Sequence, residues 1–161
     1  MTGLVSVDGA GVVSTNNFGI GPIGGILKAV CVDRQGRLWL GALDGLVCWT
    51  DGKRGSYAAN KTFTEKVTTV IHEDQLGQLW VGTYAGLTLR VNGALADWSA
   101  GKNGMDDLIN TVFEDREQNL WVGGRDGLYR LSPVRLISLT KQDGLSGNNV
   151  VSVLEDRTGA M

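Results

Sequence analysis

The groups in this chain best suited to catalysis are carboxylates, which occur three times as two acidic residues next to each other in the sequence. Two neighbouring carboxyl groups can act as general acid and base when their pKa values differ. The pairs recur at a fixed step along the chain, whereas an active site is needed only once. We therefore expect these acids to cap turns. The pairs are Glu73-Asp74, Glu114-Asp115 and Glu155-Asp156.

The chain has a single histidine, His72, on which any Ser–His–Asp triad would have to centre. No nucleophile-elbow motif supports such a triad. Equivalent positions of the repeat described below hold Cys31, Phe113 and Leu154. The sequence therefore predicts a partly buried strand residue at His72, and we do not expect an enzyme.

Composition argues against several other classes of site. Cys31 and Cys48 match no metal-ligand spacing, and no calcium loop is present, so we expect neither a metal nor a cofactor. With a net charge of -2, the chain does not have the excess of clustered Lys and Arg that a nucleic-acid-binding surface needs. No apolar stretch is long enough for a membrane span. The 24 glycines indicate many tight turns, as in all-β repeat proteins.

The sequence is organised by an internal repeat of 41 residues. One repeat has the form Asp-x-x-Gly-x-Leu-Trp-(Leu/Val)-Gly-x-x-x-Gly-Leu, in which the first glycine is replaced by Gln118 in the third copy. Several positions of the repeat, which we call columns, hold the same residue type in successive copies, so the repeat is not a chance pattern. The structural columns are Asp33, Asp74, Asp115 and Asp156, and Trp39, Trp80 and Trp121.

Each repeat predicts about four short antiparallel strands, which is the composition of a β-propeller blade. Apolar runs over 26–32, 67–71, 108–113 and 150–154 are predicted to be buried inner strands, and the Asp residues that follow them to close turns. The fold class is therefore all-β. We expect outer strands of a preceding blade in 1–25, blades in 26–66, 67–107 and 108–148, and the inner strand of a truncated blade in 149–161.

The periodic tryptophans are expected to fill the spaces between neighbouring sheets, since one sheet is too thin to bury both of its faces. Stacking on a sugar ligand is the alternative for these residues. Trp49 and Trp98 fall outside the period and are freer to make surface contacts.

Both ends of the chain fall inside a predicted blade, which leaves two interpretations. The chain is either a segment of a longer propeller or a unit whose ends meet, alone or through a second copy. The absence of a second, Leu-Trp-Val-Gly strand at both ends favours the segment.

The repeat resembles that of the two-component regulator propeller family. The resemblance is carried by the run from Val70 through Glu73-Asp74 and Leu79-Trp80-Val81-Gly82 to Gly86-Leu87, and it covers essentially the whole chain. Val32 departs from the pattern where the other repeats have glutamate. The resemblance implies part of a seven-bladed extracytoplasmic sensor propeller of a histidine kinase or hybrid two-component protein, with a small-molecule or glycan ligand.

Propellers usually bind ligands over the central channel, with loops from several blades. We therefore expect contacts from the loops leading into the inner strands, although solvated turn residues are the alternative. The candidates are Lys66, Asp107, Asn110, Asn148 and Asn149.

Other functions remain open at this stage. A protein-interaction scaffold is the second hypothesis, and a propeller lyase or hydrolase the third. Residues Met1 to Val13 lack the features of a signal peptide, so the expected location is cytoplasmic if the chain is complete and periplasmic by resemblance.

Overall fold

The structure is a computed structural model that describes residues 4–7, 13–16, 26–43, 45–50, 53–55, 67–91, 93–98, 105, 107–132 and 136–154. The prediction of an all-β fold is confirmed, because the described residues form strands and a single short 3-10 turn, η1 (Lys141–Asp143). The first hairpin joins β1 (Leu4–Val7) to β2 (Val13–Asn16).

Three four-stranded antiparallel sheets follow the hairpin. The first contains β3 (Leu27–Val32), β4 (Leu38–Ala42), β5 (Gly45–Thr50) and β6 (Lys53–Gly55). The second contains β7 (Thr68–Glu73), β8 (Leu79–Thr83), β9 (Gly86–Val91) and β10 (Ala94–Asp97). The third contains β11 (Ile109–Glu114), β12 (Leu120–Gly124), β13 (Leu128–Leu131) and β14 (Leu136–Leu139).

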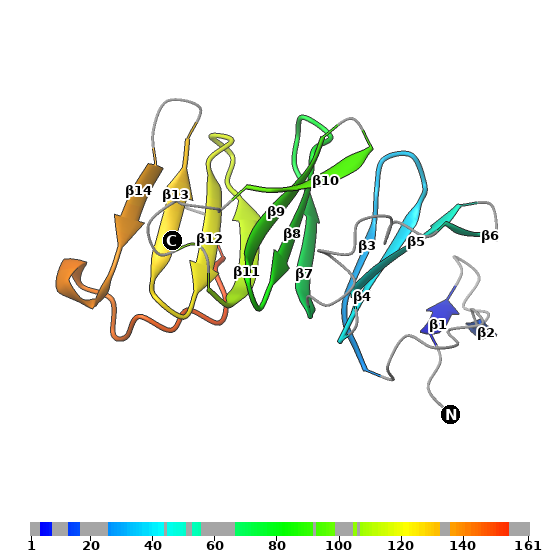
Figure 1. Cartoon of the computed structure of the whole chain (residues 1–161), viewed down its shortest axis with the longest axis horizontal. Helices are drawn as coiled ribbons and strands as arrows, with labels where there is room; N and C mark the ends of the chain where they lie inside the picture. The colour runs from blue at the N-terminus through cyan, green and yellow to red at the C-terminus, as the bar shows by residue number, and fades with distance from the viewer. Residues whose placement is uncertain are drawn as a thin grey trace.

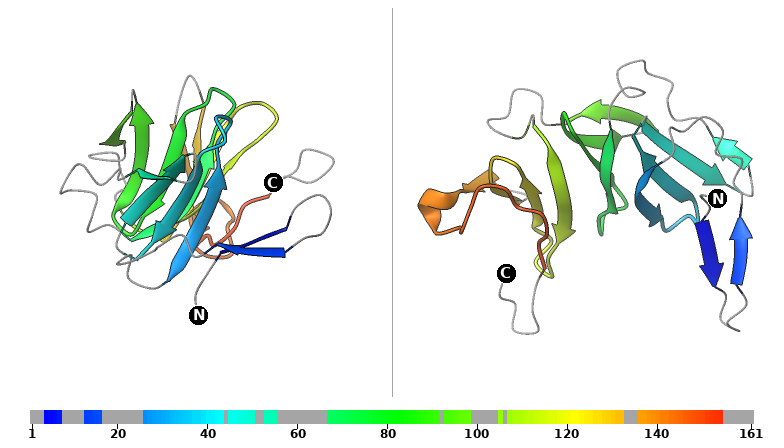
Figure 2. Two further views of the ribbon diagram at one scale, coloured as in Figure 1. Left: turned by 90° about the vertical axis from the view of Figure 1, so that its right-hand side faces the viewer. Right: turned by 90° about the horizontal axis from the view of Figure 1, so that it is seen from below.

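The sheets stand side by side in chain order (Figure 1). Their first strands lie closest together, because β7 contacts both β3 and β11. Seen from below, the row of sheets is curved (Figure 2). We call the contact between the first and second sheets the first seam, and that between the second and third sheets the second seam.

A periodic tryptophan lies at the centre of each seam. Trp39 is 0% exposed and packs against the second sheet, while Trp80 is 6% exposed and packs against the third. These clusters remove large aromatic and aliphatic surfaces from water and thereby join sheets that could not be stable alone. The main partners are Ile71, Leu79 and Val81 in the first seam, and Met105, Ile109, Val112 and Leu120 in the second.

One carboxylate per sheet both closes a turn and holds the tryptophan. Asp74 Oδ1 accepts the backbone N–H groups of Leu76 (3.0 Å) and Gln78 (2.8 Å), and its Oδ2 accepts Nε1–H of Trp80 at 2.8 Å. The same three bonds recur around Asp33 and Asp115. The turn therefore fixes the orientation of the ring that fills the seam.

These bonds also keep two of the carboxyl groups ionised. Burial alone would raise the pKa of Asp115, but hydrogen bonds from Trp121, Asn119 and Glu117 outweigh it and lower the pKa. Asp33 shows the same balance, with a lowered pKa. Because the pKa values are lower in the folded state, this stabilisation is present above about pH 4 and is lost as pH falls further.

The third sheet shows how the turn tolerates a substitution. Its turn holds Gln118 where the other two have Gly36 and Gly77, and Gln118 adopts the left-handed conformation with φ 64°. The glycines have φ values of 74° and 76°. The geometry of the turn is therefore preserved although a side chain is disfavoured there.

The first sheet differs from the prediction of a buried inner strand over 26–32. Val30 is 54% exposed, whereas its equivalents Ile71 and Val112 are each 8% exposed. The difference arises because a preceding sheet covers Ile71 and Val112, while no described residue covers Val30 in the same way.

The prediction of a buried strand over 150–154 is also not met, because these residues form no strand and Val151 is 71% exposed. Val150 nevertheless occupies the position of Ile109 one repeat earlier. The amide of Val150 donates to Gly124 O at 2.9 Å, and its side chain approaches Gly123. The segment docks as an inner strand would, but no second strand pairs with it among the described residues.

Trp98, one of the two tryptophans outside the period, packs into the second seam. Its ring meets Trp80 edge to face, with centroids 5.4 Å apart. Trp98 thus extends the core of the second seam.

We predict that Asp74→Ala destabilises the fold by about 3 kcal/mol, because the buried Nε1–H of Trp80 and two turn amides lose their acceptor. Denaturant unfolding monitored by tryptophan fluorescence measures this loss. The control is Leu76→Ala, since Leu76 lies in the same turn and is 74% exposed. Equal losses in the two variants would contradict the role assigned to Asp74.

We also predict that Gly82→Ala destabilises the second seam by about 1–3 kcal/mol. A Cβ at Gly82 would lie 2.6 Å from Val70 Cγ1 and 2.7 Å from Ile109 Cγ2, too close for either atom. Gly147→Ala is the matched control, because a Cβ there meets nothing within 4 Å. Thermal unfolding of the two variants should show a lower Tm for Gly82→Ala only.

Candidate functional site

Each inner strand carries a β-bulge at the same register. The ladders shift between Leu27 and Ala29, between Thr68 and Val70, and between Ile109 and Thr111. A bulge releases one residue from the ladder and redirects its side chain. The released residues, one repeat apart, are Lys28, Thr69 and Asn110.

All three bulge residues reach toward the segment that follows in the row. Thr69 Oγ1 donates to Ile109 O in the third sheet. Asn110 Nδ2 donates to Asn149 Oδ1 at 3.0 Å and to Val150 O at 2.9 Å. Lys28 Nζ lies 5.7 Å from the ring centroid of Tyr84 in the second sheet, within cation–π range. The bulges therefore link neighbouring units at one end of the sheets, which we call the bulge end.

The turn between the second and third strands of a sheet lies at the same end. The amide of Tyr84 donates to Val67 O, and that of Arg125 to Leu108 O, each at 3.1 Å. Tyr84 is 49% exposed, so its ring is available on this surface. Arg125 Nη1 lies 3.6 Å from Asp107 Oδ2 in an exposed ion pair, which contributes little to stability and leaves both groups accessible.

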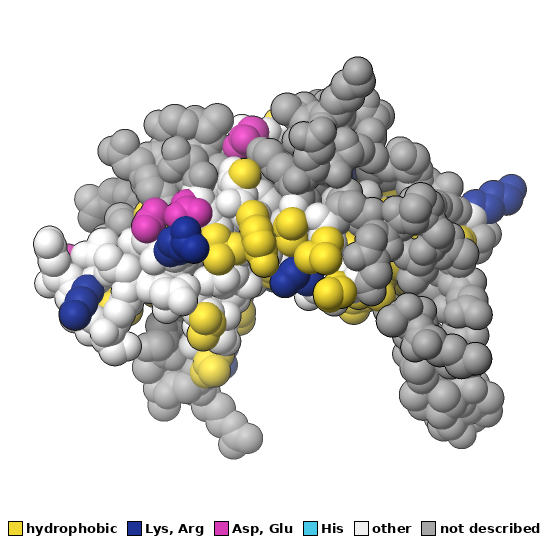
Figure 3. All heavy atoms as spheres, turned by 60° about the horizontal axis from the view of Figure 1, so that its bottom comes forward, with side chains coloured by type: hydrophobic (Ala, Val, Ile, Leu, Met, Phe, Trp, Pro, Cys, Tyr) yellow, Lys and Arg dark blue, Asp and Glu magenta, His cyan; other side chains and the backbone are white. Residues whose placement is uncertain are grey.

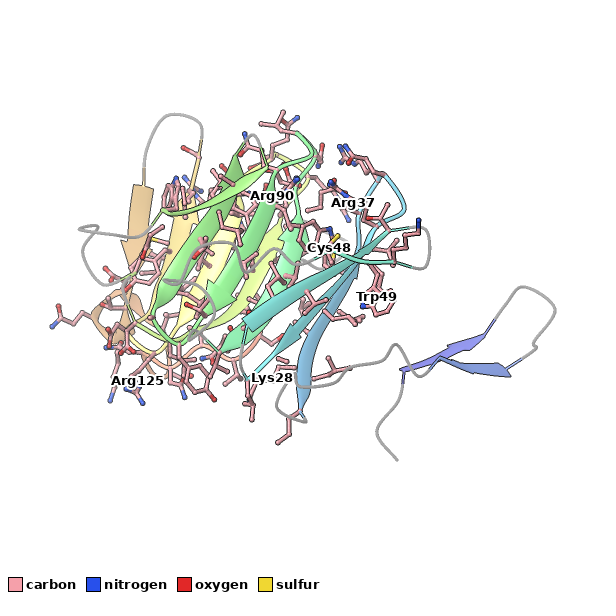
Figure 4. All side chains as sticks on the ribbon, turned by 45° about the vertical axis from the view of Figure 1, so that its right-hand side comes forward. Lys28, Arg37, Cys48, Trp49, Arg90 and Arg125 are labelled. Atoms are coloured by element: carbon pink, nitrogen blue, oxygen red, sulfur yellow. The ribbon has the colours of Figure 1, made fainter. Side chains whose placement is uncertain are left out.

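Lys28 and Arg125 project from the same end of the sheets, and Arg37 and Arg90 from the other (Figure 4). Viewed with the bottom of the molecule forward, this surface presents basic, acidic and apolar side chains close together (Figure 3). The bulge end thus combines groups that could bind a polar ligand carrying an apolar face.

Four of the five predicted site residues are described: Asp107 and Asn110 lie at the start of β11, and Asn148 and Asn149 directly precede the segment of Val150, which forms no strand. Asp107 Oδ1 accepts the amide of Leu108 at 2.6 Å, and Asn110 and Asn149 are hydrogen-bonded to each other. Asn148 Oδ1 accepts the amide of Lys141 at 2.7 Å. It also borders a hollow of about 530 Å³, lined with Thr140, Lys141 and Gln142. Lys66 lies outside the described residues, as does Asp156.

Sequence reasoning missed Lys28, Thr69, Tyr84 and Arg125. A bulge has no simple sequence signal, so the redirection of Lys28 and Thr69 could not be predicted. Comparison of the repeat columns would have found Tyr84 and Arg125. They hold the same register in successive turns but differ in side chain, whereas the neighbouring Gly86 and Gly127 are identical.

The carboxylate pairs Glu73-Asp74 and Glu114-Asp115 lie at the opposite end, beside the turns closed by the Asp column, whereas Glu155-Asp156 lies outside the described residues. Glu73 Oε2 accepts the amide of Arg34 at 2.7 Å, and Glu114 Oε2 accepts the amide of Gln75 at 2.8 Å. Each glutamate thus links its sheet to the turn of the preceding sheet. His72 lies at the same end, so the bulge end has no histidine to act as a general base.

Within the described part of the chain, no three His, Cys, Asp or Glu side chains gather as a metal site would require. No helix among the described residues is long and apolar enough to cross a membrane.

Asn110→Ala should loosen the segment that follows Asn149, because it removes the two side-chain hydrogen bonds to Asn149 and Val150 and leaves the bond from the Val150 amide to Gly124 O. We expect hydrogen exchange of the Val150 amide to accelerate about tenfold, which corresponds to about 1.4 kcal/mol. Exchange measured by NMR or mass spectrometry gives the readout. Ser146→Ala, at an exposed position shortly before Asn149, should leave exchange unchanged.

No protein-family model matches the sequence, and no curated protein matches it. Among solved structures, the chain is similar to the extracellular domain of the putative one-component system BT4673 from B. thetaiotaomicron. The TM-score is 0.77 at 15% identity, covering 98% of this chain and 23% of that one. The extracellular domain of the putative hybrid two-component system BT3049 from the same organism gives a TM-score of 0.69 at 17% identity, covering 86% and 20% of the two chains.

A catalytically inactive virginiamycin B lyase from Staphylococcus aureus, solved with quinupristin, is also similar. Its TM-score is 0.65 at 12% identity, covering 84% of this chain and 47% of the lyase. The chain spans about a fifth of the length of the two extracellular domains. At these identities the likeness concerns the fold, and the three sheets of this chain match part of a β-propeller.

Proposed function

We propose that this chain is part of an extracytoplasmic sensor propeller of a two-component signalling protein, and that its bulge end binds a small ligand. The observation that carries the proposal is the set of bulge residues. At one register of an otherwise regular repeat, three adjacent strands redirect three different polar side chains, Lys28, Thr69 and Asn110, to the same end.

Comparison of the repeats with one another supports this assignment. The columns that build the seams, such as Trp39, Trp80 and Trp121, are identical in the three sheets. The bulge column instead changes in size, charge and hydrogen-bonding capacity. A position that serves only the fold is under the same constraints in each sheet. Different polar side chains that a shared bulge directs to one end are therefore what a surface contacting an asymmetric ligand would need.

The chemistry of this end favours a ligand with both a hydroxylated edge and an apolar face, such as an oligosaccharide. The half-exposed ring of Tyr84 offers a stacking surface, and Lys28 beside it supplies hydrogen-bond donors. Arg125 and Asp107 add a donor and an acceptor. The positions of Glu73-Asp74, Glu114-Asp115 and His72 give no support to a hydrolase at this end.

The likeness to extracellular domains of putative one- and two-component systems supports the sensor role. A propeller of seven blades, with this chain supplying three of them, would place the bulge ends around one central opening. The ligand would then act by shifting the population of blade or domain arrangements, without chemical conversion.

The test is a screen of mono- and oligosaccharides against the full chain by thermal shift, followed by calorimetry of each hit. Tyr84→Ala should weaken binding at least about tenfold, since it removes the stacking surface. Leu76→Ala is the matched control, because Leu76 is an exposed apolar residue at the opposite end, and it should bind as the wild type does. Equal weakening in both variants, or hits unaffected by Tyr84→Ala, would refute a site at the bulge end.

A further inference from the structure

His72 is the one histidine of the chain and lies inside the second seam. It sits on β7, opposite Trp80 of β8, with its side chain 27% exposed. The Nε2 atom is buried and makes no hydrogen bond to any residue that the structure describes. Buried polar atoms normally have partners. This nitrogen is therefore held in the seam without one.

The group that faces His72 across the seam is Glu114 of β11. Its Oε2 lies 3.9 Å from Nε2, too far for a hydrogen bond, and its side chain is 9% exposed. The same Oε2 accepts the amide of Gln75 at 2.8 Å. The oxygen that links the two sheets is thus also the carboxylate oxygen that lies 3.9 Å from Nε2 of the imidazole. The other acids that act on the ring, Asp74 and Glu73, belong to its own sheet.

The first seam is a natural comparison, because it has the same link without a histidine. Glu73 Oε2 accepts the amide of Arg34 at 2.7 Å, and the residue in the register of His72 is Cys31. Burial raises the pKa of the Cys31 thiol, and the charge of Glu73 raises it further. Cys31 is therefore neutral at the pH values at which histidine titrates.

We propose that the second seam is an acid-labile junction. Protonation of His72 places a charge on a ring whose Nε2 is buried in the seam without a hydrogen-bond partner, and this desolvated charge loosens the contact between the second and third sheets, while the first seam holds.

The direction of the effect follows from the environment of the imidazole. Burial lowers the pKa of His72, and the charges of Glu114, Asp74 and Glu73 oppose this shift without overcoming it. The closed seam thus favours the neutral ring, and an opened seam takes up the proton more readily. The stability of the seam is full above the ordinary histidine pKa of about 6.5 and falls as pH drops below it.

The seam also determines the geometry of the bulge end, since Thr69 bonds Ile109 O across it. Loosening it would change the position of Tyr84 relative to Asp107. A pH effect on ligand binding would rest on the proposed function, but the seam effect does not, and it can be measured without a ligand.

The test compares two amides in one molecule. Exchange of the Gln75 amide, bonded to Glu114, and of the Arg34 amide, bonded to Glu73, is followed by NMR at about pH 7.5 and about pH 5 and corrected for intrinsic rates. Protection of Gln75 should fall by up to about tenfold for each pH unit below the histidine pKa, while that of Arg34 stays constant. Equal changes at both amides would overturn the proposal.

Exchanging residues between the seams separates His72 from general acid effects. In His72→Cys and His72→Phe, which install the residues found at this register in the first and third sheets, the acid-dependent loss at Gln75 should disappear. Cys31→His should transfer the loss to Arg34. Persistence of the loss in both His72 variants, or an imidazole that titrates in NMR at or above about pH 6.5, would refute an acid-labile seam.

Discussion

The hydrogen bond between a buried aspartate and the indole N–H of a tryptophan is the interaction on which the rest of this structure depends. A tryptophan ring fills each seam, and its nitrogen needs a partner once water is excluded. The aspartate supplies one oxygen to the indole and the other to the adjacent turn, as at Asp74. The turn and the seam therefore form together, and neighbouring sheets are stabilised by the contact rather than by their own cores.

In this arrangement, the residues that hold the sheets together and the residues proposed to contact a ligand lie at opposite ends of each inner strand. The end near Asp33, Asp74 and Asp115 is closed by turns and by the glutamate links, and the Asp and Trp residues that hold it are identical in the three sheets. At the bulge end, one residue of each inner strand is released from the hydrogen-bond ladder, and this residue differs from sheet to sheet. A repeat can therefore change the groups at the bulge end without weakening the contacts that hold the sheets together.

Much of the fold could be predicted because the period restricts it. The fixed step locates the strands, the turns and the seam tryptophans, since each must serve the same purpose in every copy. What depends on neighbouring units could not be predicted. The exposure of Val30, the absence of a strand at 150–154 and the packing of Trp98 each depend on which surfaces meet in space. The bulges that redirect Lys28, Thr69 and Asn110 arise from strand pairing, to which sequence periodicity is insensitive.

The residues that depart from the repeat show which exchanges the fold tolerates. Gln118 keeps the left-handed turn of a glycine, so the turn geometry tolerates this exchange. Val32 replaces a glutamate that links sheets in the other repeats and is 65% exposed, so the first sheet has no such carboxylate for a preceding turn. His72 adds an ionisable ring to a seam whose counterpart has a thiol. Each exchange leaves the Asp–Trp bond intact. Variation is therefore compatible with the fold wherever it spares that bond, and this permits one repeat to form seams with different properties.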